Sequence, residues 1–292
     1  MNAIGIDLGG TNLRIAKINE DGKILKVVKV ATEAEKGSEQ IADKMIRFVN
    51  EIKDEETRGI GIGVPGQVNN ETKMVLQSTN VKMANFALAK FVEEGTNLKC
   101  IMNNDANVAA LGEAKAGAGF GKDVVYYITW STGIGGGLVI NGKVHDGANF
   151  NTGEIGNLII WPNSTYKHSI QNYGSWEGEA GGLAIKRYVA ELGYDDEYSF
   201  FEAYRQGNEQ VVEKVEYITD TFARGVANIM HTIEADKIVI GGGVALKSGD
   251  VLLPLVKKKV NNYVMETMID KVIIDTAALG DDNGLIGASF LV

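Results

Sequence analysis

The sequence predicts an α/β protein built from two related domains that face one cleft. Its 292 residues, 45% of them hydrophobic, are enough for two closely joined domains. Strand-like apolar runs alternate along the chain with helix-like patterns. One device also occurs twice, at residues 4–23 and 126–143: a strand, a turn rich in Gly and Thr, a second strand and a Gly-Lys turn. This repeat favours two domains with a common origin.

The predicted strands are short apolar runs, many of them rich in β-branched residues. They cover residues 3–6, 13–18, 24–30, 59–64, 99–102, 124–129, 137–140, 237–240 and 271–275. Helical periodicity follows in other segments. Ser38 is expected to cap a helix that carries apolar residues on one face as far as Ile52. Further helices are expected over residues 108–116 and 209–234 and from about Asn283 onward.

Charge and composition exclude several classes of protein. The formal net charge of −9 argues against nucleic acid as a partner. No apolar run is long enough to span a bilayer, and the first residues lack a signal-peptide pattern, so a cytoplasmic protein without a membrane partner is expected. The single cysteine, Cys100, can form neither an internal disulfide nor a cysteine-based zinc site. It is expected to be a buried thiol.

Two glycine-rich turns are candidate phosphate-binding sites. Gly9, Gly10 and Thr11 follow the first predicted strand, and Thr132 and Gly133 lie in the corresponding later turn. Glycine lets backbone approach a phosphate closely, successive N–H groups bind anions, and threonine adds a hydroxyl donor. Each turn alone could be only a tight hairpin, but their pairing favours phosphate binding. Neither turn has the Walker or dinucleotide-binding spacing.

Three further features fit such a site. Asp7, directly before the first turn, suits the Mg²⁺ ion of ATP, although it could instead stabilise the turn. Gly241 and Gly242 follow a predicted strand and leave bare backbone against which a ring could lie. Asp105 lies between a strand and a helix, where active sites of open α/β sheets collect. It, or Asn104, could instead be only a helix cap.

These residues resemble a known family, the ROK family of bacterial sugar kinases and related repressors, within the actin/hexokinase superfamily. The resemblance covers nearly the whole chain and rests on six short motifs, which are highly specific in this order. They are Asp7-Leu8-Gly9-Gly10-Thr11, Gly63-Val64-Pro65-Gly66, Asn104-Asp105-Ala106-Asn107, Ser131-Thr132-Gly133-Ile134-Gly135-Gly136-Gly137, Gly153-Glu154-Ile155-Gly156 and Gly241-Gly242-Gly243. The resemblance implies a two-domain, actin-like ATPase fold, related to ribonuclease H, with a cleft between the domains. We expect a small domain over residues 1–105, completed by 283–292, and a larger one over 106–282.

The resemblance also implies a role for each motif. Asp105 matches the catalytic base, which accepts the proton of the sugar hydroxyl that attacks ATP. Asn104, Glu154 and Glu177 match residues that hydrogen-bond the sugar, and Asn80 is a further candidate. The other matches are Gly9, Gly10, Thr11, Thr132 and Gly133 to the phosphate turns, Gly241 and Gly242 to the stretch beside the adenosine, and Asp7 to the Mg²⁺ position, reached through water.

One segment departs from the family pattern. Many members follow Glu-Ile-Gly with a histidine and then a cysteine-rich zinc loop. Here Asn157 stands in place of that histidine, and residues 161–174 contain no cysteine and one histidine, His168. No structural zinc is therefore expected. Asn157 is a candidate for direct sugar contact, and the aromatic residues of the segment are expected to pack it in place of a metal, although they could also line the sugar pocket.

The resulting expectation is an ATP- and Mg²⁺-dependent kinase that phosphorylates a hexose at its 6-hydroxyl, as a glucokinase does. Kinases for N-acetylmannosamine, fructose or a β-glucoside are open alternatives. A non-catalytic sugar-sensing regulator is a further alternative. It is disfavoured because no helix-turn-helix fits ahead of Asp7 and because the acidic charge opposes DNA binding. The resemblance also implies a homodimer.

Overall fold

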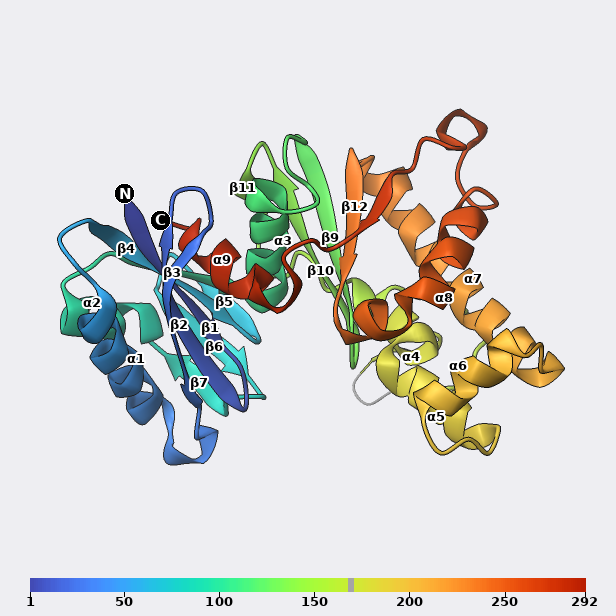
Figure 1. Cartoon of the computed structure of the whole chain (residues 1–292), viewed down its shortest axis with the longest axis horizontal. Helices are drawn as coiled ribbons and strands as arrows, with labels where there is room; N and C mark the ends of the chain where they lie inside the picture. Colours follow the sequence, from blue (N-terminus) through green and yellow to red (C-terminus); the bar gives the residue numbers. More distant parts are fainter. Residues whose placement is uncertain (168–170) are drawn as a thin grey trace. The chain divides into compact units, whose positions relative to one another are not determined.

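The computed structural model describes residues 1–167 and 171–292 (Figure 1). His168 lies outside these described residues. The chain forms two compact units. Unit 1 comprises Met1–Tyr127, Gly137–Gly153 and Ala277–Val292, and unit 2 comprises Ile128–Gly136 and Glu154–Thr276. The expected domain boundaries at residues 105 and 282 stay a prediction.

Unit 1 is built on a five-stranded sheet with the strand order β3-β2-β1-β4-β8. β1 pairs antiparallel with β2 and parallel with β4, which in turn pairs parallel with β8. The short turn after β1 fixes the register of the β1–β2 hairpin, in which Asp7 lies opposite Arg14. The strands are Asn2–Leu8 (β1), Asn12–Asn19 (β2), Ile24–Ala31 (β3), Thr57–Val64 (β4) and Cys100–Asn104 (β8).

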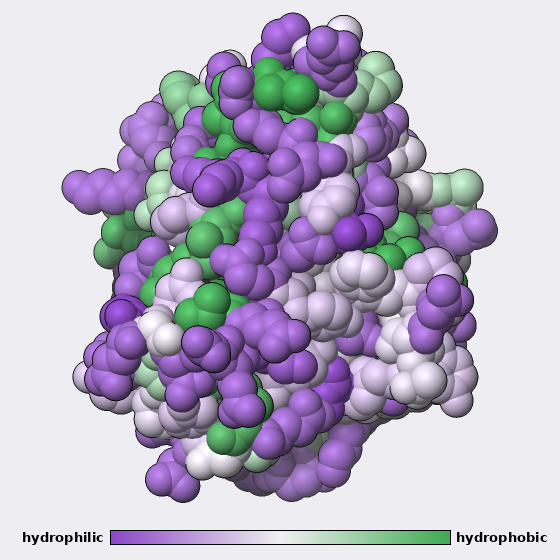
Figure 2. Space-filling view, turned by 90° about the vertical axis from the view of Figure 1, so that its right-hand side faces the viewer, coloured by the Kyte–Doolittle hydropathy of each residue, from purple (hydrophilic) through white to green (hydrophobic). Residues whose placement is uncertain are grey.

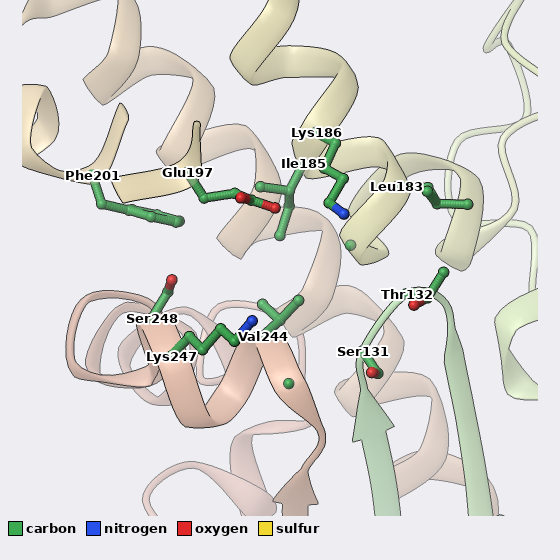
Figure 3. Close-up of a pocket in the computed structure, with 12 residues that line it drawn as sticks. Ser131, Thr132, Leu183, Ile185, Lys186, Glu197, Phe201, Val244, Lys247 and Ser248 are labelled. Atoms are coloured by element: carbon green, nitrogen blue, oxygen red, sulfur yellow. The ribbon is translucent and has the colours of Figure 1, made fainter. Parts of the chain in front are cut away.

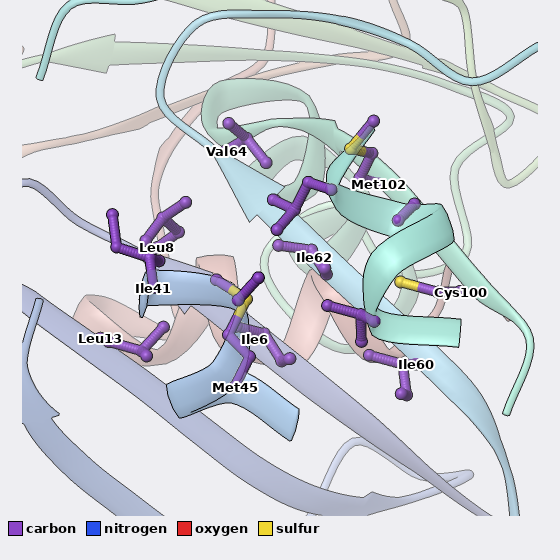
Figure 4. Packing of buried hydrophobic residues seen from close by; sticks show 14 of the residues in the cluster. Ile6, Leu8, Leu13, Ile41, Met45, Ile60, Ile62, Val64, Cys100 and Met102 are labelled. Atoms are coloured by element: carbon purple, nitrogen blue, oxygen red, sulfur yellow. The ribbon is translucent and has the colours of Figure 1, made fainter. Parts of the chain in front are cut away.

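The two faces of this sheet bury different side chains, as the twofold period of a strand requires. Ile6 of β1 and Ile15 of β2 belong to the larger core, together with residues of α1 (Ser38–Ile52) and α2 (Leu88–Thr96). Figure 4 shows Met45 of α1 among the strand side chains. Cys100 lies in the same core, as expected, and burial raises the pKa of its thiol.

The opposite face of the sheet packs against α9 (Asn283–Ser289), which in turn contacts α3 (Asp105–Ala116). The approach is so close that only glycine fits at the contacts. A Cβ added to Gly5 of β1 would lie 2.1 Å from the carbonyl oxygen of Leu285, and one added to Gly61 of β4 would lie 1.7 Å from that of Ala288. The last helix of the chain is therefore part of the interior of unit 1.

A small three-stranded antiparallel sheet completes unit 1. Its order is β5-β6-β7, and its strands are Gln67–Asn69 (β5), Met74–Ser78 (β6) and Met83–Phe86 (β7). Gly66, directly before β5, has a φ of 142°. The hydroxyl of Ser78 donates a hydrogen bond to the carbonyl oxygen of Pro65 and so ties β6 to this bend.

A second five-stranded sheet has the order β11-β10-β9-β12-β13. β10 and β11 pair antiparallel, and β12 and β13 pair parallel. The boundary between the two units falls within β9 and β10. The strands are Val124–Trp130 (β9), Ile134–Ile140 (β10), Lys143–Val144 (β11), Lys237–Gly241 (β12) and Ile274–Thr276 (β13).

Unit 2 contains most of the helices and an aromatic core. Trp130, the last residue of β9, stacks on Phe222 with ring centroids 3.7 Å apart, and its indole N–H donates to the carbonyl oxygen of Ala180 at 2.7 Å. The helices of unit 2 are Trp176–Ala180 (α4), Gly182–Glu191 (α5), Glu197–Arg205 (α6), Glu209–Ile233 (α7) and Gly243–Val260 (α8). Short 3₁₀ turns are Ala34–Lys36 (η1), Ile155–Asn157 (η2), Glu266–Met268 (η3) and Gly280–Asp282 (η4).

The predicted strands and helices all overlap elements of the structure, and the α/β fold is confirmed. The last predicted strand, 271–275, is mostly wrong, because β13 is Ile274–Thr276. One further detail is wrong. Gly37, and not Ser38, is the N-cap of α1, and Ser38 is the first helical residue. The φ of 94° at Gly37 is a conformation that serine would adopt only with strain.

The surface agrees with the composition of the chain. On the face shown in Figure 2, hydrophobic residues occur as small groups among hydrophilic ones. Among the helices that the structure describes, none has both the length and the apolar character needed to cross a bilayer.

Candidate functional site

The turn after β1 presents backbone and a hydroxyl group to solvent. The N–H of Gly9 donates to the carbonyl oxygen of Asn12 at 2.9 Å, and the hydroxyl of Thr32 donates to the carbonyl oxygen of Gly9 at 2.6 Å. Gly10 and Thr11 at the tip are exposed. The turn is therefore held at its base and open at its tip, as a phosphate-binding turn must be.

Gly10 and Asn80 lie together in unit 1. A Cβ added to Gly10 would lie 3.0 Å from the backbone carbonyl oxygen of Asn80. The need for glycine here is one of close packing, because Gly10 does not have a positive φ. The structure thus brings a predicted sugar-binding residue next to the first predicted phosphate turn.

Asp7 lies at the end of β1 in a charged and partly buried setting. The guanidinium of Arg14 donates to the carboxylate of Asp282 and to the carbonyl oxygen of Asp281, the latter at 2.6 Å. Burial raises the pKa of Asp7, the positive charge of Arg14 opposes this rise, and the charge of Asp282 adds to it. A Cβ added to Gly284 of α9 would lie 3.7 Å from the Asp7 carboxylate. A hard oxygen ligand beside bare backbone suits a hydrated Mg²⁺ ion.

At the start of α3, Asn104 caps the helix and Asp105 presents an exposed carboxylate. The side chain of Asn104 is the N-cap: it accepts the N–H of Ala106 at 2.9 Å and donates to the carbonyl oxygen of Gly66 at 3.1 Å. Asp105 is the first helical residue and is exposed, and its carboxylate accepts the same Ala106 N–H at 2.9 Å. The capping alternative therefore applies to Asn104, and the Asp105 carboxylate is accessible to a substrate.

In unit 2, Glu177 of α4 holds the second glycine turn. Its Oε2 accepts the N–H of Ile134 at 2.8 Å, and a Cβ added to Gly133 would lie 2.1 Å from the same oxygen. Its Oε1 accepts a hydrogen bond from the side-chain amide of Gln171 at 2.5 Å. The carboxylate predicted to bind sugar is thus engaged by the turn on one side and by the segment before α4 on the other.

The start of α5 holds the same turn from its other side. The N–H groups of Gly182 and Leu183 donate to the carbonyl oxygens of Ser131 and Thr132, at 2.8 and 3.0 Å. These two N–H groups are therefore occupied, and the exposed residue Thr132 is the one that the turn offers to a ligand.

Glu154 directly precedes the 3₁₀ turn η2, Asn157 is the last residue of that turn, and both are exposed. Burial raises the pKa of Glu154, and the negative charge of Glu177 raises it further. The two carboxylates are therefore close enough to interact. Glu154 and Asn157 have the acceptors and donors that suit sugar hydroxyl groups.

The segment 158–167 is anchored on the buried carboxylate of Glu179. Glu179 is 3% exposed. It accepts hydrogen bonds from the hydroxyl groups of Tyr217 at 2.9 Å, of Tyr188 at 3.2 Å and of Ser164. Ser164 belongs to the segment, while the tyrosines belong to α5 and α7. The carboxylate thus joins three pieces of chain.

Aromatic packing completes this anchor. Trp161 stacks on Tyr217 with ring centroids 5.7 Å apart, and its indole N–H donates to the hydroxyl of Thr221 at 2.9 Å. The guanidinium carbon of Arg187 lies 3.3 Å from the centroid of the Tyr166 ring. Within residues 1–167 and 171–292, no group of three or more His, Cys, Asp or Glu side chains could hold a metal ion. The expected absence of zinc stays a prediction.

One cavity of about 170 Å³ lies within unit 2, between the turn at Ser131 and Thr132 and the helices α5, α6 and α8 (Figure 3). α8 begins beside it. Gly242 is the N-cap of α8 with a φ of 90°, and Gly243 lines the cavity. A helix N-terminus offers unpaired N–H groups and a partial positive charge, which suit phosphate and polar ligands. The predicted glycines Gly241 and Gly242 therefore directly precede Gly243, which forms part of the cavity wall.

Sequence reasoning missed most of the residues that line this cavity. They include Leu183, Lys186, Glu197, Phe201, Lys247 and Ser248. Each occupies an ordinary position on a helix, and no motif marks it. The available signal was weak: Gly243 follows a strand and opens a helix, so residues one turn later on that helix can face the same space.

The sequence model of the ROK family matches residues 3–292. The chain belongs to the ROK family. A ROK relative from Thermotoga maritima, a glucokinase, is 32% identical over 100% of this chain and 97% of its own length. An N-acetylmannosamine kinase of Escherichia coli is also 32% identical, over 100% of this chain and 98% of its own length. The resemblance found from the six motifs is thereby confirmed.

A solved structure supports the same assignment. The ROK family glucokinase from Streptomyces griseus in complex with glucose and AMPPNP is 30% identical and has a TM-score of 0.78, covering 100% of this chain and 99% of its own. The fold of this ROK protein is therefore that of the family's sugar kinases.

Proposed function

We propose that this ROK protein is a sugar kinase that transfers the γ-phosphoryl group of ATP to a hydroxyl group of a hexose, the 6-hydroxyl as in a glucokinase. The observation that carries the proposal is the state of Asp105. Its carboxylate is exposed at the start of α3, while its neighbour Asn104 supplies the helix cap. Together with relatives that are named sugar kinases, this favours Asp105 as the base that accepts the hydroxyl proton.

ATP would be held by the two glycine turns and by the cavity of unit 2. Thr132 and the start of α8 suit the phosphates and ribose, and the exposed tip at Gly10 and Thr11 offers N–H groups and a hydroxyl. Asp7 would hold a water ligand of Mg²⁺. When bound, the ion neutralises charge on the phosphates. The remaining task of the chain is to orient the sugar and to accept its proton.

On the sugar side, the candidates have different remaining capacity. Glu154, Asn157 and Asn80 are exposed, so we propose that they bind hydroxyl groups directly. Asn104 and Glu177 already make hydrogen bonds to backbone groups, so we propose that they hold the surrounding loops and offer the sugar only their remaining capacity. The relatives do not decide the sugar, because a glucokinase and an N-acetylmannosamine kinase are equally identical to this chain.

The proposal is tested by ADP release from Mg-ATP across glucose, mannose, fructose, N-acetylmannosamine, N-acetylglucosamine, allose and cellobiose. The variant Asp105→Ala is run beside the wild type, with a circular dichroism spectrum as the folding control. Activity on one sugar that the variant loses supports the kinase and names its substrate. Silence on every sugar, from a folded protein that binds ATP, overturns the simple hexokinase proposal in favour of an unusual sugar or of a sugar sensor without catalysis. A cytoplasmic location and a homodimer remain predictions.

A further inference from the structure

We propose that Glu197 recognises an amino group on the base of the nucleotide substrate and thereby selects the phosphoryl donor. The inference rests on the proposed kinase function and deepens it. Glu197 is the first residue of α6 and lines the cavity of unit 2 (Figure 3).

The cavity has two chemically different ends. Ser131 and Thr132 lie at one end, and Phe201 and Ser248 lie at the other, as Figure 3 shows. The phosphates belong at the end with the glycine turn, because that end has the turn residues Ser131 and Thr132 and the start of α8. A nucleotide with its phosphates there directs its base toward Phe201 and Glu197.

The dimensions and walls of the cavity suit a planar base. Pockets that enclose a whole drug-sized ligand have roughly 300–1,000 Å³. This one has about 170 Å³, which suits one part of a nucleotide. Ile185 of α5 and Val244 of α8 face each other across it and Phe201 lies at its end, so a flat ring would lie between apolar side chains.

Glu197 has a free capacity to accept hydrogen bonds. Within the residues that the structure describes, no ion pair or side-chain hydrogen bond engages its carboxylate, although Lys186 and Lys247 line the same cavity. The start of α6 does not require it as a cap, because Asp196 accepts the N–H of Ser199 at 2.8 Å. A glutamate in the first turn of a helix can also stabilise the helix through the helix dipole. Stabilisation of the helix does not explain why Glu197 lines the cavity.

The chemistry of the carboxylate defines the ligand. An ionised carboxylate only accepts hydrogen bonds, so it favours a base edge that donates N–H groups. Adenine offers its 6-amino group, and guanine offers its 2-amino group and N1–H. An unsubstituted purine offers only ring nitrogen acceptors at that edge, and it would leave the partly buried carboxylate without a partner. The recognised class is therefore an aminopurine nucleoside triphosphate.

The test compares ATP, GTP and purine riboside triphosphate with the wild type, Glu197→Ala and Glu197→Gln. Direct binding is measured by titration calorimetry in the presence of Mg²⁺, and kcat/KM is measured with the accepted sugar. A hydrogen bond to a charged group contributes about 1.5–3 kcal/mol, which is about a ten- to hundredfold preference. We expect the wild type to prefer ATP or GTP to purine riboside triphosphate by that factor.

In Glu197→Ala the preference should fall to about threefold or less, because the aminopurine nucleotide loses affinity and the purine riboside does not. Glu197→Gln should keep part of it, because its amide oxygen still accepts. The matched control is Glu213→Gln, an exposed glutamate on α7 outside the cavity. An unchanged preference in Glu197→Ala overturns the inference and leaves the kinase proposal standing. The binding titration needs no turnover, so it also decides the inference if no sugar is phosphorylated.

Discussion

The carboxylate of Glu177 accepts the backbone N–H of Ile134 at 2.8 Å, and the same oxygen fills the space beside Gly133. Its second oxygen accepts from Gln171, and its charge acts on Glu154. One side chain therefore links the second glycine turn to the candidate sugar-binding residue. A change in the charge of Glu177 should affect both the second glycine turn and the pKa of Glu154. The pH dependence of sugar binding measures the effect on Glu154.

The KM for the sugar should rise as the pH falls through the pKa of Glu154. Only the ionised carboxylate can accept hydrogen bonds from sugar hydroxyl groups with both of its oxygens. The pKa of Glu154 is raised in the folded protein, so this acid limb should lie above the ordinary range of a glutamate. Glu177→Gln removes the repelling charge and should shift the limb to lower pH. In Glu154→Gln the limb should disappear, and a limb that stays unchanged in both variants would rule out Glu154 as its origin.

Asn104→Ala and Asp105→Ala should separate stability from catalysis. Asn104→Ala removes the cap of α3 and the contact with Gly66, so the free energy of unfolding should fall by about 1–2 kcal/mol. Asp105→Ala changes an exposed side chain and should alter stability by about 0.5 kcal/mol or less. Its rate of phosphoryl transfer should nevertheless fall by about 10²–10⁴-fold. Urea unfolding and ADP release measure the two quantities, and comparable catalytic losses at equal stability would contradict this division.

Gly242→Ala and Gly243→Ala are neighbours with opposite expectations. At Gly242 the φ is 90°, and a Cβ would lie 2.6 Å from the carbonyl oxygen of Trp130, so we expect a loss of at least about 1–3 kcal/mol in unfolding free energy. At Gly243 the nearest atom to a Cβ is the hydroxyl oxygen of Ser131 at 3.6 Å, an ordinary contact. That variant should be within about 1 kcal/mol of the wild type. Thermal unfolding decides, and equal melting temperatures would refute the strain assigned to Gly242.

Glu179→Ala should destabilise the protein by about 1–3 kcal/mol, because the part-buried hydroxyl of Tyr217 loses its acceptor, while that of Tyr188 keeps only the backbone carbonyl oxygen of residue 179. Glu179→Gln should cost less, because its amide oxygen still accepts. Glu191→Ala is the matched control: its side chain is 53% exposed and pairs with Arg187, and its loss should cost about 0.5 kcal/mol or less. If urea unfolding gives the two alanine variants equal stability, Glu179 is not the anchor of the segment 158–167.

The sequence predicted the fold more completely than it predicted the candidate site. Sequence patterns located many of the elements, because α1 has one clearly buried face and β1 is a short apolar run buried on both faces. They missed α2, α8 and the small sheet of β5, β6 and β7. The glycine motifs located the two turns. The sequence could not show that Asn104 caps α3, or that Glu177 binds the backbone of Ile134, because both depend on which polar groups fold next to each other. Glu197 carries no motif at all, since its importance comes only from the cavity that α6 lines.

The glycine contacts of α9 also bear on how the chain folds as it is synthesised. Gly5 and Gly61 are made early, but their packing partners Leu285 and Ala288 are made much later. Leu285 follows Gly61 by 224 positions (285 − 61), a stretch that takes roughly 10–45 seconds to synthesise at about 5–20 residues per second. During that interval the apolar face formed by Ala16 and Ile18 has no covering helix. A chain in which α9 is missing would keep that face exposed, which would make it a substrate for chaperones and proteases.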